Sequence, residues 1–390
     1  MHLDRDDEKM LHGEYGETCQ KMMEILVALG KVFGADRLIP ITSAQVSGAS
    51  YKTIGEWGLK WLESLQAKVA VPTILNPVGM PREGWEEIGI SRDFAEKQLA
   101  IIEAYRHLGV RLECTCTPYY LHMVKYGEHL AWAESSAVVY ANSVIGARTN
   151  REGGPSALAA AIVGKTPNYG LHHIGNRCPS IAFTLDGGGD LTAREDVFGA
   201  IGYIAGKKAG AKIPLFTGIR PRREELKSLG AAMAATGAVS IFHVEGLTPE
   251  ARIFKYESRN LETITIDKSE VDALFGEMEV DAVAIGCPHC SPDELITIAR
   301  LLKGTKVKKP LFIFASREVI RTSKAAVDAI IRSGAKVIPD TCMVVSPFME
   351  QYRSIMVDSG KALAYVPSMC GALARLGTRT ECIRVATSSS

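Results

Sequence analysis

One stretch points to the fold class of this chain: Val280-Asp281-Ala282-Val283-Ala284-Ile285-Gly286-Cys287-Pro288-His289-Cys290-Ser291. Its first half is a short apolar run rich in β-branched residues, which is typical of a buried strand in a parallel sheet. Ser291 and Pro292 then have the residue types preferred at the N-cap and in the first turn of a helix. Cys287 is therefore predicted at the carboxyl end of a buried strand, beside a helix N-terminus that favours the thiolate.

The same alternation of short apolar strands and helices runs through the chain from about residue 190 onward. It predicts an α/β protein with mostly parallel sheets. At roughly 100–200 residues per domain, a chain of 390 residues is expected to be multi-domain. We predict an N-terminal α/β domain over residues 1–165 and α/β structure over 166–390, which can be divided again near 240–260.

Composition limits the classes of function. The formal net charge is +1, so no overall basic field favours nucleic acid or an anionic membrane surface. No apolar run approaches the roughly 20 residues that a membrane span needs. The charged segment Met1–Lys9 does not resemble a secretory signal, and we expect a cytoplasmic protein. Nine cysteines in such a chain favour free thiols or metal ligands over disulfides.

Two further cysteines follow predicted strands. Cys116 comes after the run 110–113, and Cys342 comes after the run 336–339. Because ligand sites in α/β sheets lie outside the carboxyl ends of the strands, we expect Cys116, Cys287 and Cys342 to converge. Three thiolates that leave one position open suit a 4Fe–4S cluster whose free iron acts as a Lewis acid. A four-sulfur zinc site built from Cys114, Cys116, Cys287 and Cys290, or three unrelated buried cysteines, are the alternatives.

Several other segments have more than one interpretation. Residues 127–143 are predicted as one helix, and residues 362–366 as a strand followed by the cap of a last helix. The loop Ser47–Ser50 enters a helix and can present backbone N–H groups to an anion. His172 and His173 are a weak metal candidate, because no partner lies four residues away.

The chain resembles the aconitase X family in motifs that occur in the same order over almost its whole length. These motifs are Ser47-Gly48-Ala49-Ser50, Asn76-Pro77, Cys116-Thr117-Pro118-Tyr119, Glu134-Ser135-Ser136 with Asn142-Ser143, Gly286-Cys287-Pro288-His289 and Asp340-Thr341-Cys342. The resemblance implies aconitase-like three-layer α/β domains and a 4Fe–4S cluster on Cys116, Cys287 and Cys342, with Cys114 and Cys290 as bystanders. It also implies a substrate pocket lined by Gly48, Ala49, Ser50, Asn76, Pro77, Glu134, Ser135 and Lys361.

The family has two layouts, one with an extra swivelling domain in the same chain and one with that domain on a small second subunit. Because this chain ends soon after its last predicted helix, we expect the large subunit of a heterodimer. The resemblance then implies an archaeal mevalonate-pathway hydro-lyase that converts (R)-5-phosphomevalonate to trans-anhydromevalonate 5-phosphate. The general base is expected on the small subunit, with Glu134 or Ser135 as alternatives. A dehydratase of cis-3-hydroxy-L-proline and a zinc-stabilised scaffold without catalytic activity are the other hypotheses.

Overall fold

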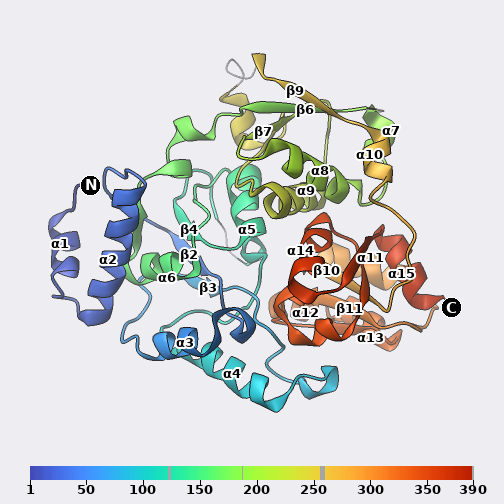
Figure 1. The fold of residues 1–390 in the computed structure, drawn as a ribbon, viewed down its shortest axis with the longest axis horizontal. Coiled ribbons are helices and arrows are strands. Elements are labelled where there is room, and N and C mark those ends of the chain that lie inside the picture. Colours follow the sequence, from blue (N-terminus) through green and yellow to red (C-terminus); the bar gives the residue numbers. More distant parts are fainter. Residues whose placement is uncertain (122–123, 187, 255–259, 389–390) are drawn as a thin grey trace.

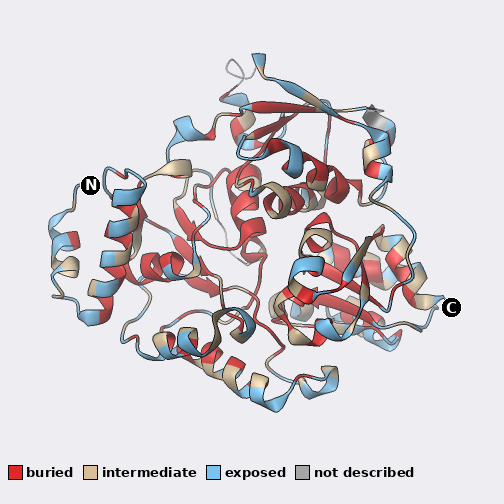
Figure 2. Cartoon of the chain, in the orientation of Figure 1, coloured by how far each residue is buried: buried red, intermediate tan, exposed pale blue. Residues whose placement is uncertain are grey.

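The computed structural model describes residues 1–121, 124–186, 188–254 and 260–388. Figure 1 shows three parts, each built around its own parallel sheet with helices against it. This arrangement confirms the prediction of a multi-domain α/β protein with mostly parallel sheets. In Figure 2 the inner strands of the sheets are buried, whereas some edge strands and the outward faces of the helices are exposed. None of the helices in the described ranges is long and apolar enough to cross a membrane.

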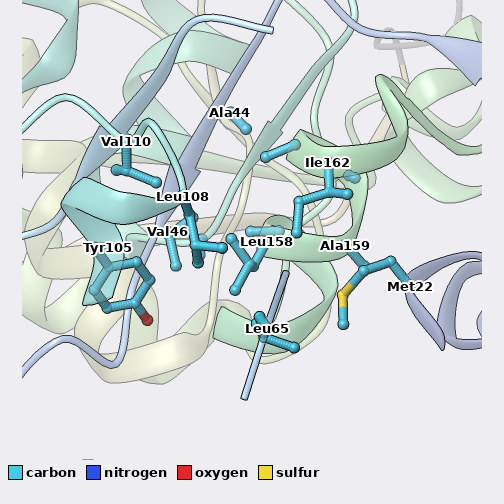
Figure 3. Close-up of a cluster of buried hydrophobic side chains, with 14 of the residues drawn as sticks. Met22, Ala44, Val46, Leu65, Tyr105, Leu108, Val110, Leu158, Ala159 and Ile162 are labelled. Carbon is cyan, nitrogen blue, oxygen red and sulfur yellow. The ribbon is translucent and has the colours of Figure 1, made fainter. Parts of the chain in front are cut away.

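The N-terminal part contains a three-stranded parallel sheet in the order β3-β2-β4 (Thr73–Leu75, Ser43–Val46, Leu130–Trp132). Its helices are α1 (Arg5–Leu11), α2 (Glu17–Val32), α3 (Tyr51–Glu63), α4 (Arg92–His107) and α6 (Gly154–Val163). The antiparallel pair β1 (Leu38–Pro40) and β5 (Lys165–Pro167) lies beside them. Figure 3 shows the core, in which Leu158 and Ile162 of α6 lie among side chains of α2 and β2. The small residues of α6 allow this close packing.

The second part has a four-stranded parallel sheet in the order β8-β7-β6-β9 (His243–Val244, Pro214–Phe216, Ile181–Leu185, Thr263–Ile266). Helices α8 (Val197–Ala209) and α9 (Arg223–Gly237) pack against each other, and α7 (Gly188–Thr192) and α10 (Lys268–Asp272) are short. The two long helices approach closely at Gly202, where an added Cβ would lie 2.3 Å from the carbonyl oxygen of Leu229. Glycine at this position therefore permits backbone-to-backbone contact.

The third part has a five-stranded parallel sheet in the order β12-β11-β10-β13-β14 (Lys336–Ile338, Leu311–Ala315, Ala282–Cys290, Ser354–Val357, Leu373–Leu376). Ala282 and Ala284 of β10 face the core that includes α14 (Gly360–Cys370). Val283 and Ile285 face the opposite core. The helices on that second side include α11 (Pro292–Leu301), α12 (Arg317–Thr322), α13 (Lys324–Arg332) and α15 (Arg379–Thr387). Strand alternation thus produces three layers, helix–sheet–helix.

Three local predictions are wrong, and all three affect candidate site residues. The run 110–113 before Cys116 is not a strand, because only Arg111 pairs, in an isolated bridge with Ile74. Residues 127–143 contain strand β4, and α5 (Ser135–Tyr140) begins only after it, with Glu134 as its N-cap. β4 is a strand because it pairs with β2 inside the first sheet. Residues 362–366 are helical, within α14, although Pro367 lies inside that helix. A short apolar run does not distinguish a buried strand from a buried helix, and Pro367 is unusual in a helix interior.

Candidate active site

The segment that carries Cys287 bulges out of β10. Pairing with β11 runs from Val283 to Ile285 and resumes only at Cys290. Gly286 begins the bulge with φ +107°, and a Cβ there would lie 2.3 Å from the carbonyl oxygen of Phe314. Ser359, the N-cap of α14, donates a hydrogen bond from its hydroxyl to the carbonyl oxygen of Cys287. The backbone of Cys287 is therefore held by the sheet and by α14 together.

Replacing Gly286 by alanine is expected to lower the free energy of unfolding by about 2–4 kcal/mol, because the new Cβ meets backbone and the φ angle is unfavourable for an L-residue. Chemical denaturation monitored by circular dichroism measures the change. Gly276→Ala is the matched control, because Gly276 is exposed and has nothing within 4 Å of an added Cβ. Equal stability of Gly286→Ala and the natural chain would contradict the close approach to Phe314.

Cys116 and Cys342 lie on loops that contact the Cys287 segment and the segments next to it. The sulfur of Cys116 accepts a hydrogen bond from the backbone N–H of His289 at 3.2 Å. The backbone N–H of Cys342 donates to the carbonyl oxygen of Val78 at 3.0 Å, which ties the Cys342 loop to the N-terminal part. Three chain segments far apart in sequence therefore meet between the first and third parts of the molecule.

The three thiols share one electrostatic environment. Burial raises the pKa of Cys116 to about 12, and the charge of Lys361 acts in the opposite direction. Burial also raises the pKa of Cys287 and of Cys342, and in both cases Lys361 is again the main opposing group. Cys116 and Cys342 each contribute to the raised pKa of Cys287. Lys361 is thus one buried cation that acts on all three thiols and favours their thiolate forms.

Lys361 forms a buried ion pair with Glu134 beside these thiols. The Nζ–Oε1 distance is 2.5 Å, and both side chains are less than a tenth exposed. The Glu134 carboxylate also accepts hydrogen bonds from the Ser136 hydroxyl at 2.5 Å, the Ala137 N–H at 2.7 Å and the Ser135 hydroxyl at 3.2 Å. Burial acts to raise the pKa of Glu134, but Lys361 and these donors hold it below its usual value. Burial acts to lower the pKa of Lys361, but Glu134 raises it above the ordinary lysine value.

The predicted loop Gly48-Ala49-Ser50 is held close to the Cys342 segment. The Ser50 hydroxyl donates to the carbonyl oxygen of Val345 at 2.9 Å. The buried side chain of Gln98 on α4 accepts from the N–H of Tyr51 at 3.1 Å and donates to the carbonyl oxygen of Ala49 at 2.8 Å. The loop therefore has a fixed shape at the N-terminus of α3.

Asn76 and Pro77 also lie where the first and third parts meet. The N–H of Asn76 donates to the carbonyl oxygen of Val46 at 2.9 Å, and Val78, immediately after Pro77, forms a bridge with Thr341. The Asn76-Pro77 segment is therefore joined to the residue before Cys342.

The remaining candidate ligands lie elsewhere. Cys114 is fully buried in the N-terminal core, where Asp340 is the charged group with the largest effect on its pKa. Cys290 is buried in the core on the α11 side of the third sheet, near Glu294. His172 forms a pair with His129, with 2.9 Å between their Nδ1 atoms. The charged neighbours of Cys114 and Cys290 differ from those of Cys116 and Cys287, which argues against the four-sulfur zinc site.

A cavity of about 550 Å³ between α9 and α11 reaches the backbone of Cys287 from the second part of the molecule. Its wall includes Lys227, which is paired with Glu294 and donates to the carbonyl oxygen of His289 at 3.3 Å. Lys227 therefore contacts the Cys287 segment from the α9 side. The Glu294 carboxylate already neutralises its charge.

Sequence reasoning missed three residues that contact the predicted site. Gln98 is a polar residue on the buried face of α4, which is a detectable signal in an amphipathic helix. Ser136 is the third residue of the Glu134 motif, and its hydroxyl accepts from Lys361 at 3.1 Å. His289 belongs to the Cys287 motif, but nothing in the sequence indicates which segments its ring joins.

The chemistry of this donor set fits an iron–sulfur cluster. Among the described residues, no three His, Cys, Asp or Glu side chains are grouped closely enough to hold a single metal ion. The ligands of a cluster can lie farther apart than those of a single metal ion. Each cysteine binds a different iron, and the inorganic core lies between the sulfurs. Cys116, Cys287 and Cys342 are the residues that would hold it.

Comparison with known proteins identifies the family of this chain. Three family models match in chain order: the aconitase X first domain over residues 1–174, the second domain over 179–276 and the third domain over 280–388. This chain belongs to the aconitase X family. The crystal structure of aconitase X from Thermococcus kodakaraensis in its holo form superposes with a TM-score of 0.91 and 46% identity, and covers 99% of this chain and 100% of the other.

Relatives within the aconitase X family fall into two groups by name. The phosphomevalonate dehydratase large subunit of Methanosarcina mazei is 53% identical, with 99% of this chain and 97% of the relative covered. The protein of the same name from Methanocaldococcus jannaschii is 46% identical, with 95% and 96% covered. The cis-3-hydroxy-L-proline dehydratase of Pseudomonas aeruginosa is 33% identical, and this chain covers 70% of it.

Proposed function

We propose that this chain is the large subunit of a phosphomevalonate dehydratase, a hydro-lyase that removes water from (R)-5-phosphomevalonate to give trans-anhydromevalonate 5-phosphate. The proposal rests on the share of each relative's length that this chain matches, taken together with the sequence identity. The large subunits of that name are matched over 94–97% of their length at 36–53% identity, whereas the hydroxyproline dehydratases are matched over 68–70% at 32–33%. The partner is then a small subunit with the swivelling domain, and the reaction takes place in the cytoplasm.

In this proposal Cys116, Cys287 and Cys342 hold a 4Fe–4S cluster. When bound, such a cluster supplies a Lewis acid that makes hydroxide a better leaving group. The chain itself contributes a buried cation, Lys361, which opposes the raised pKa values of the thiols and, while paired with Glu134, is assigned to an anionic group of the substrate. Glu134 is saturated with donors, which suits it to holding Lys361 in place more than to abstracting a proton.

The substrate carries a carboxylate, a β-hydroxyl and a distant phosphate. We assign an anionic group of the substrate to the Gly48-Ala49-Ser50 loop at the start of α3. The N–H groups of Tyr51 and Thr53 in the first turn already donate to Gln98 and to the Ser50 carbonyl, so the backbone of the loop itself is the proposed donor. Asn76, whose side-chain amide oxygen accepts from the Gln45 amide at 3.5 Å, is proposed as a further polar contact of the substrate. The general base is assigned to the small subunit, so the large subunit alone is expected to be inactive.

The test is anaerobic co-production of this chain with its small subunit, followed by assays with (R)-5-phosphomevalonate and with cis-3-hydroxy-L-proline. We expect water elimination from the phosphorylated substrate only, and no turnover by either subunit alone. Turnover of cis-3-hydroxy-L-proline in place of phosphomevalonate would instead identify the chain as part of a cis-3-hydroxy-L-proline dehydratase. Zinc without iron or sulfide in the purified pair, together with no turnover, would support a scaffold subunit.

A further inference from the structure

The ring of His289 is fully buried where the three cysteine-bearing segments meet. His289 is 1% exposed and follows Cys287 by two residues. Its Nε2 lies 2.9 Å from the carbonyl oxygen of Thr341, the residue before Cys342. Its Nδ1 lies 3.3 Å from the hydroxyl oxygen of Thr115, the residue before Cys116. One imidazole therefore joins the neighbours of both other cysteines.

The protons around this ring can be assigned from its partners. A carbonyl oxygen only accepts, so Nε2 carries the hydrogen and donates to Thr341. Nδ1 then accepts from the Thr115 hydroxyl. The Thr115 oxygen in turn accepts from the N–H of Thr117 at 3.1 Å and lies 3.0 Å from the Thr117 hydroxyl. Every polar atom in this buried network has a partner, which is the condition under which such networks make a site rigid.

The groups that the ring contacts are themselves fixed. Asp340, before Thr341, is fully buried and paired with Arg82 at 3.1 Å and with Arg317 at 2.6 Å. Thr115 is held by its N–H, which donates to the carbonyl oxygen of Leu75 at 3.0 Å. The imidazole therefore links two loops that are each held in place by other contacts.

We propose that His289 is a positioning residue that holds the loops of Cys116 and Cys342 at the spacing the cluster requires. The inference rests on the cluster assignment under the proposed function. Groups that orient ligands in this way typically change metal affinity or activity by about 10–100-fold when they are replaced. Its backbone N–H already contacts the Cys116 sulfur, so backbone and ring act on the same arrangement.

The experiment compares His289→Leu, which removes both ring contacts, with His289→Gln, whose side-chain amide can still donate to the Thr341 carbonyl. In the anaerobically prepared two-subunit enzyme, we expect ferrozine to extract iron from the leucine variant about 10–100-fold faster than from the natural enzyme. The glutamine variant should lie within about 3-fold of the natural rate. The decrease in the charge-transfer absorbance of the cluster measures the same loss of iron and does not depend on an activity assay.

His243→Leu is the matched control. His243 is equally buried, and its Nε2 likewise donates to a backbone carbonyl oxygen, that of Arg177, at 2.8 Å. It lies in the second part, away from the cysteines, so its loss should reduce the melting temperature without faster iron release. Natural-rate iron release from His289→Leu, or equally fast release from His243→Leu, overturns the proposal. Absence of iron in the natural enzyme would instead overturn the cluster assignment.

Discussion

Replacing Cys287 by serine is expected to give a folded, colourless protein with no bound cluster and at least about 10³-fold less dehydratase activity. A metal centre of this kind supplies several kcal/mol of transition-state stabilisation, and each 1.36 kcal/mol is a factor of ten in rate. Serine is close to cysteine in size but is a poor ligand for iron. Iron and sulfide analysis, the visible spectrum and the phosphomevalonate assay of the reconstituted pair measure the effect.

The fold of that variant should persist, because β10 is buried along its whole length and the packing residues Val283 and Ile285 are unchanged. Cys178→Ser provides the control for loss of a thiol, because Cys178 is half-buried and lies outside the cysteine site. It should retain iron and activity. Full iron content and full activity in Cys287→Ser would remove the cluster assignment.

The placement of Cys287 and Cys342 near the ends of strands could be predicted because their signal is local, whereas Cys116 follows no strand, since the run 110–113 forms only the bridge of Arg111 with Ile74. Apolar β-branched runs mark buried parallel strands, and in such sheets the carboxyl ends of the strands meet at one edge. The Ser291 N-cap predicted from residue type is present, with its hydroxyl accepting from the N–H of Glu294 at 3.2 Å. These features need no knowledge of the rest of the chain.

The charge network at the site could not be predicted in the same way. Lys361 and Glu134 are 227 residues apart, and the sequence around each residue does not indicate that the two form an ion pair. The prediction of a strand over residues 362–366 also hid the fact that Lys361 is in the first turn of α14, from which it extends toward α5. The joint role of His289 with Thr115 and Thr341 depends likewise on long-range packing.

Replacing Lys361 by methionine is expected to lower the free energy of unfolding by about 3–5 kcal/mol, because it leaves the Glu134 carboxylate buried without its counter-charge. Activity should fall by about 10²–10³-fold, the usual effect of losing one buried donor at a reacting centre. Denaturant titration and the phosphomevalonate assay measure the two effects. Lys60→Met is the control: Lys60 pairs with Glu56 at 3.5 Å on an exposed helix face, and its loss should change stability by less than about 1 kcal/mol.

The double variant Lys361→Met with Glu134→Gln distinguishes the charge from the packing. Removing both charges takes away the unpaired carboxylate, so much of the lost stability should return, as it does when buried ion pairs are replaced as a unit. Activity should not return, because the thiols would still lack the cation that opposes their raised pKa values. Stability that falls by the sum of the two single losses would mean that the two side chains are not coupled. Activity restored in the double variant would show that Lys361 serves Glu134 alone and has no part in the chemistry of the site.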